Sequence, residues 1–228
     1  MKIKVVHFHN KTNKNIFGRL IQLSVLINRQ QKTIEAITKA IKTDKGYIIT
    51  KEKVNFYCNH TGIAFERDGK WLIHMVSSGL KEEFYDLQDL TKRYNIFEEI
   101  IDVNRIEFLR QLKLIKADLK NYSYGWIGAL ASFRFAKRFL KLGEWIDNFF
   151  DKKRDKNIKK GNSLEKHCTA LAIKLFFFPS SPANKYNLIE RLRRYHNKKY
   201  NKKLTRDEVS FEYFMRESTP ADLFCSGF

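Results

Sequence analysis

Apolar residues recur along the chain in two patterns, one typical of helices and one typical of strands. Spacings of three and four residues predict helices over the ranges 17–28, 33–42, 87–94, 105–120, 126–150, 164–178 and 186–200. Short apolar runs predict strands over the ranges 4–8, 47–50, 54–57, 62–65, 71–76 and 97–103. Strands and helices are mixed without an internal repeat or a clear linker, which predicts one α+β domain spanning residues 1–228.

The strongest local signal is a hairpin that turns at Asp68-Gly69, between the predicted strands 62–65 and 71–76. His60 stands at the start of its first strand and His74 lies in the second. Side chains that oppose each other on neighbouring antiparallel strands are close enough to interact. We therefore expect the two rings to pair across the hairpin. A single strand histidine is more often structural, whereas a pair favours a catalytic base and its support.

Cys168 lies near the start of the helix predicted over residues 164–178, after Asn162 and Glu165, which form a capping-box pattern. The positive end of a helix dipole stabilises a nearby thiolate and lowers the pKa of the thiol. A cysteine nucleophile also needs an imidazole that accepts its proton, which the hairpin histidines would supply. The other interpretation of Cys168, as a small buried residue on an apolar helix face, remains open.

Five segments, in the order NHTGIAF, WLIHMVSSG, NYSYGWIGALAS, HCTALA and STPADLFCSG, carry a resemblance to a known family. They resemble the circularly permuted, papain-like NlpC-type cysteine amidohydrolases, in which the histidine strand precedes the cysteine helix. The resemblance covers roughly residues 54–80 and 120–228. It implies a small antiparallel sheet packed against helices, with a helical and basic insertion at about residues 132–160.

The resemblance also implies roles for four residues. Cys168 matches the nucleophile and His60 the general base, while His74 matches the residue that orients the base. Tyr124 matches a tyrosine near the site. The implied activity is cysteine-dependent hydrolysis of amide or isopeptide bonds, for example in peptidoglycan stem peptides.

The same order of two histidines and a cysteine is similar to that of the lecithin:retinol acyltransferase-like proteins. Chemistry on a lipid ester is therefore an alternative function. In that case the aromatic and basic stretch 126–150 would lie on anionic lipid. Packing of this stretch into the core is its other interpretation.

Composition adds a strong charge imbalance. The chain has 44 Lys and Arg residues against 25 Asp and Glu residues, a net charge of +19. This charge predicts an anionic partner, which could be nucleic acid, lipid or cell-wall polymer. A third function is therefore open, that of a nucleic-acid-binding or structural protein, including one with assembly partners in a virion. The segment RLRRYHNKKYNKK, with Tyr195 and Tyr200, would then follow a phosphate backbone, unless it is a solvated face.

Disulfide-rich, metal-binding and membrane-spanning classes of protein are disfavoured. Cys58, Cys168 and Cys225 are too few for a disulfide framework. His7 and His9 share one strand face, but no metal-ligand spacing completes a site, and we expect neither metal nor cofactor. We find no signal peptide or membrane-spanning run, which predicts a cytoplasmic or virion-associated protein. The abundance of Lys, Asn and Ile hints at a phage.

Overall fold

The computed structural model describes residues 1–12, 29–76, 79–117, 168–200, 203–206 and 210–227, with the isolated residues 19, 22, 23, 25, 26, 145, 148, 149 and 152. Within them, strands form one antiparallel sheet in the order β3-β2-β7-β1-β4-β5-β6. The strands are β1 (Lys2–Asn10), β2 (Lys32–Thr43), β3 (Gly46–Phe56), β4 (His60–Glu66), β5 (Lys70–Val76), β6 (Gly79–Phe84) and β7 (Tyr94–Asp102).

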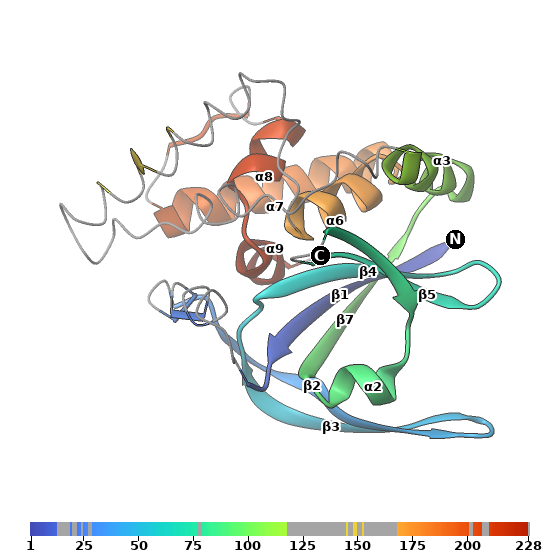
Figure 1. Ribbon diagram of the computed structural model, residues 1–228. Helices are drawn as coiled ribbons and strands as arrows, with labels where there is room; N and C mark the ends of the chain where they lie inside the picture. The colour runs from blue at the N-terminus through green and yellow to red at the C-terminus, as the bar shows by residue number, and fades with distance from the viewer. Residues whose placement is uncertain are drawn as a thin grey trace.

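The helices lie on both sides of this sheet. They are α2 (Leu87–Thr91), α3 (Arg105–Ala117), α6 (described over Cys168–Phe177), α7 (Pro182–Tyr200), α8 (Phe211–Glu217) and α9 (Pro220–Ser226). Figure 1 shows α3 and α6 to α9 on one side of the sheet and α2 on the other, next to β2. The α+β class is confirmed. No helix of the described ranges is long and apolar enough to cross a membrane.

Each face of the sheet carries its own hydrophobic core, because successive side chains of a strand point to opposite faces. We call the side covered by α3 and α6 the helix face. Its core contains Ile3, Val5, Ile63, Ile73, Phe108, Cys168, Ala172 and Phe176. We call the other side the α2 face. Its core contains Val6, Phe8, Ile37, Ala64, Leu72, Leu87, Leu90 and Ile96. Strand register therefore decides on which side every functional side chain lies.

The helix predicted over residues 33–42 is wrong, because this segment is strand β2. Ile37 pairs with Lys51 and Lys39 pairs with Thr50, so Thr38 is the extra residue of a β-bulge. The bulge leaves Ala36, Ile37 and Ala40 all buried. Their spacing imitates the period of a helix, although the run is rich in β-branched residues that favour strands.

The other predicted elements are mostly present, with changed ends. The hairpin at Asp68-Gly69 is confirmed as β4 and β5. The two strands predicted over 47–50 and 54–57 are one strand, β3, and β6 was not predicted. The helix predicted over 87–94 ends at Thr91, and Tyr94 begins β7. The predicted elements 17–28 and 126–150 lie outside the described residues, apart from isolated positions.

Asp222 anchors α9 to the rest of the molecule through a buried polar cluster. Its carboxylate accepts hydrogen bonds from Gln30 Nε2 at 2.6 Å and from the Tyr200 hydroxyl at 2.8 Å. It also accepts the Thr219 backbone N–H at 2.8 Å, as part of the capping box that begins α9. A fully buried carboxylate is tolerated only with such partners. The cluster thus joins α7, α9 and the residues that precede β2.

We predict that Asp222→Ala lowers the free energy of unfolding by about 3 kcal/mol, because it leaves the buried donors of Gln30 and Tyr200 without their acceptor. Urea denaturation followed by circular dichroism measures this change. Asp89→Ala is the matched control, since Asp89 is exposed and forms a surface ion pair with Lys92, and it should change little. Equal stability of the Asp222→Ala variant and the wild type would contradict the anchoring role.

Candidate functional site

His60 and His74 form a hydrogen-bonded pair on the α2 face. His60 Nε2 lies 2.9 Å from His74 Nδ1 across the β4–β5 hairpin. The pair packs on Phe8, whose ring centroid is 5.3 Å from that of His60. His74 is buried, with 6% of its surface exposed, whereas His60 is partly exposed. The expected pairing of the two rings is therefore observed, with His60 on the solvent side.

Glu83, on strand β6, extends this pair into a row of three groups. His74 Nε2 lies 3.2 Å from Glu83 Oε1, at ion-pair distance but without hydrogen-bond alignment. Glu83 also pairs with Lys81. Burial, followed by electrostatic interaction with His60 and with the positive charges of Lys81 and Arg93, lowers the pKa of His74 to about 2. His74 is therefore neutral at physiological pH.

Because His74 is neutral, the ring nitrogens that carry the protons in the row can be assigned. A neutral imidazole has one N–H, and the Glu83 carboxylate favours that proton on His74 Nε2. His74 Nδ1 then accepts the hydrogen bond that His60 Nε2 donates. In neutral His60 this leaves the lone pair on Nδ1, which has no hydrogen bond to any described residue. The arrangement presents a base at the open end of the row.

Gly62 makes room for the pair. It is the Cα partner of His74, two residues after His60 on the same face. A Cβ atom at Gly62 would lie 3.0 Å from His74 Cβ and 3.0 Å from Leu72 Cδ1, which is too close without a shift. The motif His-x-Gly therefore has a local steric reason.

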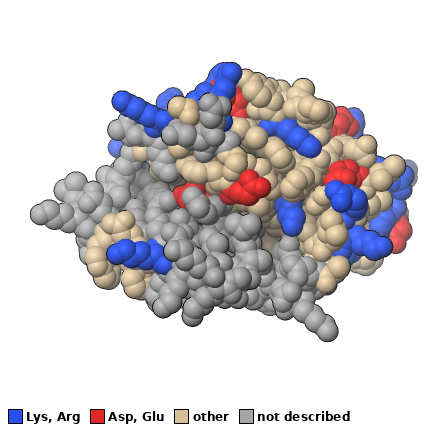
Figure 2. Space-filling view, turned by 90° about the horizontal axis from the view of Figure 1, so that it is seen from above, with Lys and Arg blue, Asp and Glu red and all other residues tan. Residues whose placement is uncertain are grey.

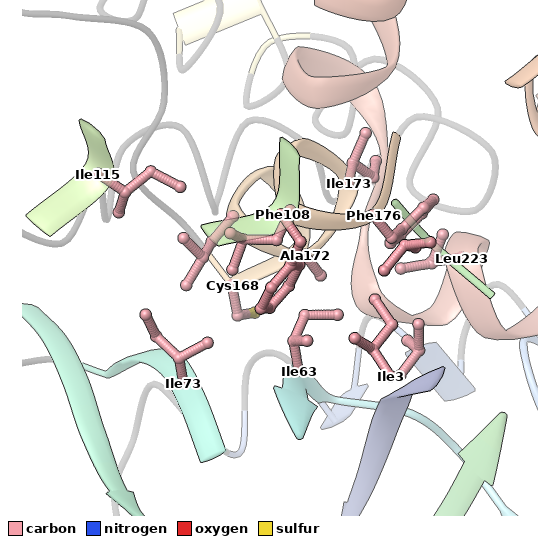
Figure 3. Close-up of a cluster of buried hydrophobic side chains, with 14 of the residues drawn as sticks. Ile3, Ile63, Ile73, Phe108, Ile115, Cys168, Ala172, Ile173, Phe176 and Leu223 are labelled. Carbon is pink, nitrogen blue, oxygen red and sulfur yellow. The ribbon is translucent and has the colours of Figure 1, made fainter. Parts of the chain in front are cut away.

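Cys168 does not join this pair, and this differs from the expected thiol site. Figure 3 shows Cys168 pointing toward Ile63 and Ile73 within the core of the helix face, where it is 3% exposed. His60 and His74 belong to the opposite face, because His60 is the partner of Phe8 and His74 that of Gly62. The sheet thus separates the thiol from both rings.

A second row, which the sequence did not predict, lies on the helix face. Cys58 Sγ is 3.5 Å from His7 Nδ1, and His7 Nε2 is 2.9 Å from Glu99 Oε2. Burial raises the pKa of the Cys58 thiol far above its ordinary value. The neutral thiol also donates to the His60 carbonyl at 3.2 Å. Buried thiols with a raised pKa are inert, so this row is best explained as a hydrogen-bonded part of the core.

Only long-range pairing could reveal this second row. His7 lies opposite Thr61 in the β1–β4 ladder, and Glu99 lies beside them on β7. These neighbours come from three distant segments, and no sequence motif joins them. His9, the other histidine of β1, packs against Tyr57 at 3.9 Å between ring centroids. Among the described residues, no group of three or more His, Cys, Asp or Glu side chains could hold a metal ion.

Residues 191–200 of the basic segment lie in α7, and its tyrosines face inward. The hydroxyls of Tyr195 and Tyr200 lie within 3.2 Å and 3.4 Å of Gln30 Nε2. Arg193 and Arg194 pair with Glu190. The tyrosines are therefore engaged rather than presented for stacking on bases. Figure 2 shows the basic side chains of the described part of this side as separate groups.

Tyr124, the insertion expected over residues 132–160 and the capping box at Asn162 lie outside the described residues, apart from isolated positions. Comparison of the chain with protein-family models, with curated proteins and with solved structures gives no match. The site is therefore defined by its geometry.

We predict that the free energy of unfolding falls as the pH is lowered from about 6.5 toward 4. Between pH 2 and 6.5 the unfolded chain protonates His74 while the native state does not, so acid favours unfolding. The contribution of His74 is at most about 1.4 kcal/mol per pH unit. Urea denaturation at several pH values should give a shallower slope for His74→Gln than for the wild type. Equal slopes for the two proteins would contradict the conclusion that His74 is neutral in the native state.

His9→Gln is a useful comparison in the same series. Burial lowers the pKa of His9 to about 4, so acid destabilisation from this residue has the same sign over a narrower pH range. Its effect on the slope should end near pH 4, whereas the effect of His74 should continue below it.

We also predict the order in which the thiols react with iodoacetamide in the native protein. Cys225 should be labelled first, because it is partly exposed while Cys58 and Cys168 are buried. Peptide mass spectrometry after timed labelling measures this order. In urea all three cysteines should react at similar rates. Preferential native labelling of Cys168 would show that its thiol is accessible and would contradict this arrangement.

Proposed function

We propose that the protein is a hydrolase of carboxylic esters in which His60 is the general base. The observation that carries this proposal is the row His60–His74–Glu83, with its 2.9 Å and 3.2 Å separations. A partly exposed imidazole, backed by a neutral ring and a carboxylate, fits the geometry of a base and its orienting groups.

In the proposed reaction, His60 Nδ1 accepts a proton from a water molecule while the water oxygen attacks the acyl carbon. The resulting imidazolium is stabilised through His74 and Glu83. When the tetrahedral intermediate collapses, the bond to the alkoxide breaks and His60 returns the proton to that alkoxide.

An ester is favoured over an amide because none of the three thiols contacts an imidazole of this row. Cys168 belongs to the core of the helix face, and Cys58 contacts His7 on the same side. Cys225 packs beside the cluster of Phe56 and Phe224. Amide hydrolysis usually needs a stronger nucleophile than water with a single imidazole base. Thiol-dependent cleavage of amide or isopeptide bonds, including peptidoglycan stem peptides, requires that Cys168 reaches His60.

We further propose that the fold is a permuted papain-like one. The order of elements supports this proposal, since the histidine hairpin β4–β5 precedes helix α6, which carries Cys168. The capping box of α9 at Thr219 corresponds to the closing segment of the resemblance. On this fold the base and its orienting residue are retained, and water replaces the thiol as the attacking group.

The test is hydrolysis of a series of p-nitrophenyl esters and the matching anilides. His60→Ala should lower kcat/KM on the esters by about 10²- to 10⁴-fold, because it removes the base. Glu83→Gln should cause a smaller loss, since His74 then loses the charge that fixes its tautomer. Cys168→Ala should retain wild-type ester activity.

His9→Ala is the matched control, because His9 lies on the helix face of the sheet, whereas the row lies on the α2 face. Circular dichroism establishes that each variant is folded. If His60→Ala retained ester activity, the proposal would fail. If Cys168→Ala abolished activity on either bond, the attacking group would be the thiol, and the water mechanism would be overturned.

A further inference from the structure

The β2–β3 hairpin ends in an uncovered apolar tip. Figure 1 shows this hairpin extending past α2, and β3 is the last strand at its edge of the sheet. Ile41 and Ile48 are Cα partners, so their side chains share one face of the hairpin. They are 45% and 61% exposed, and neighbouring Ile49 is 42% exposed. Two large aliphatic side chains are thus exposed together on this face, and Ile49 is exposed on the other face of β3, opposite Ala40.

Lysines surround this apolar tip. Residues 39–53 contain five lysines and two acidic residues, a net charge of +3. Lys45 stands at the turn and Lys42 lies near the end of β2, and both are exposed. Lysine stems cover apolar surface while their ammonium groups remain in the polar layer. Apolar side chains surrounded by lysines are complementary to the surface of an anionic bilayer.

The shape of the tip also favours a bilayer over a protein partner. It is a projecting turn, closed at Gly46 with a positive φ of 129°, and not a groove that holds a partner chain. Pairing of another strand along β3 is opposed by Lys51 and Lys53, because charged side chains protect an exposed sheet edge. A stable protein interface usually needs a much larger surface than three isoleucines provide.

We propose that residues 39–53 dock the protein on anionic lipid bilayers, with Ile41 and Ile48 inserted among the acyl chains and the lysines at the head groups. This inference is independent of the hydrolase proposal. It assigns the lipid contact to the hairpin tip and not to the stretch 126–150.

Co-sedimentation with sucrose-loaded vesicles tests this docking, using phosphatidylcholine alone and an equimolar mixture with phosphatidylglycerol. The wild type should bind the anionic vesicles and should bind neutral vesicles only weakly. The double variant I41S/I48S should partition about tenfold or more weakly into the anionic vesicles. Ile106→Ser is the matched control, since Ile106 is 79% exposed on α3, and it should bind as the wild type does.

Charge is tested separately with K42E/K45E, which should lose the preference for anionic vesicles. Lys113→Glu, at an exposed position on α3, is its control. Wild-type binding by I41S/I48S, or equal weakening by Ile106→Ser, would overturn the proposal. The proposal would also be overturned if the wild type self-associated without binding vesicles and I41S/I48S abolished this self-association. The tip would then join two copies of the chain. Both hairpin variants should hydrolyse a soluble ester normally, so this test can fail while the hydrolase proposal stands.

Discussion

The register of three neighbouring strands is the constraint on which the site depends. Phe8 pairs with His60 in the β1–β4 ladder, and Gly62 pairs with His74 in the β4–β5 ladder. Because a strand has a period of two, a shift by one residue would move every side chain to the other face. The register holds both imidazoles on the α2 face, and it leaves Ile63 on the helix face, where it contacts the core that contains Cys168.

The two faces also differ in their electrostatic environment. On the helix face, burial keeps the Cys58 thiol protonated, next to His7. On the α2 face, burial and nearby positive charges keep His74 neutral, while His60 retains contact with solvent. Burial therefore keeps a thiol neutral on one side of the sheet and an imidazole neutral on the other. Solvent access, more than residue type, distinguishes the two rows.

Local signals in the sequence were sufficient for one part of the site. Asp68-Gly69 predicted the hairpin, and the hairpin predicted the pairing of His60 with His74, because both depend on residues close together in the chain. Glu83 was not predicted, since β6 lacks a clear apolar alternation. The face of Cys168 could not be predicted either, because it depends on how α6 packs against strands about a hundred residues earlier. The bulge at Thr38 likewise concealed strand β2.

Gly62 has a consequence for how this site could be gained or lost. The room between the two strands depends on one missing methyl group, so an alanine at this position would require a small shift of His74 Cβ or of the Leu72 side chain. All the polar groups of the row would still be present in such a chain, but the separation of the two imidazoles would change. A comparison of related sequences should therefore consider the residue at the position of Gly62 together with the two histidines.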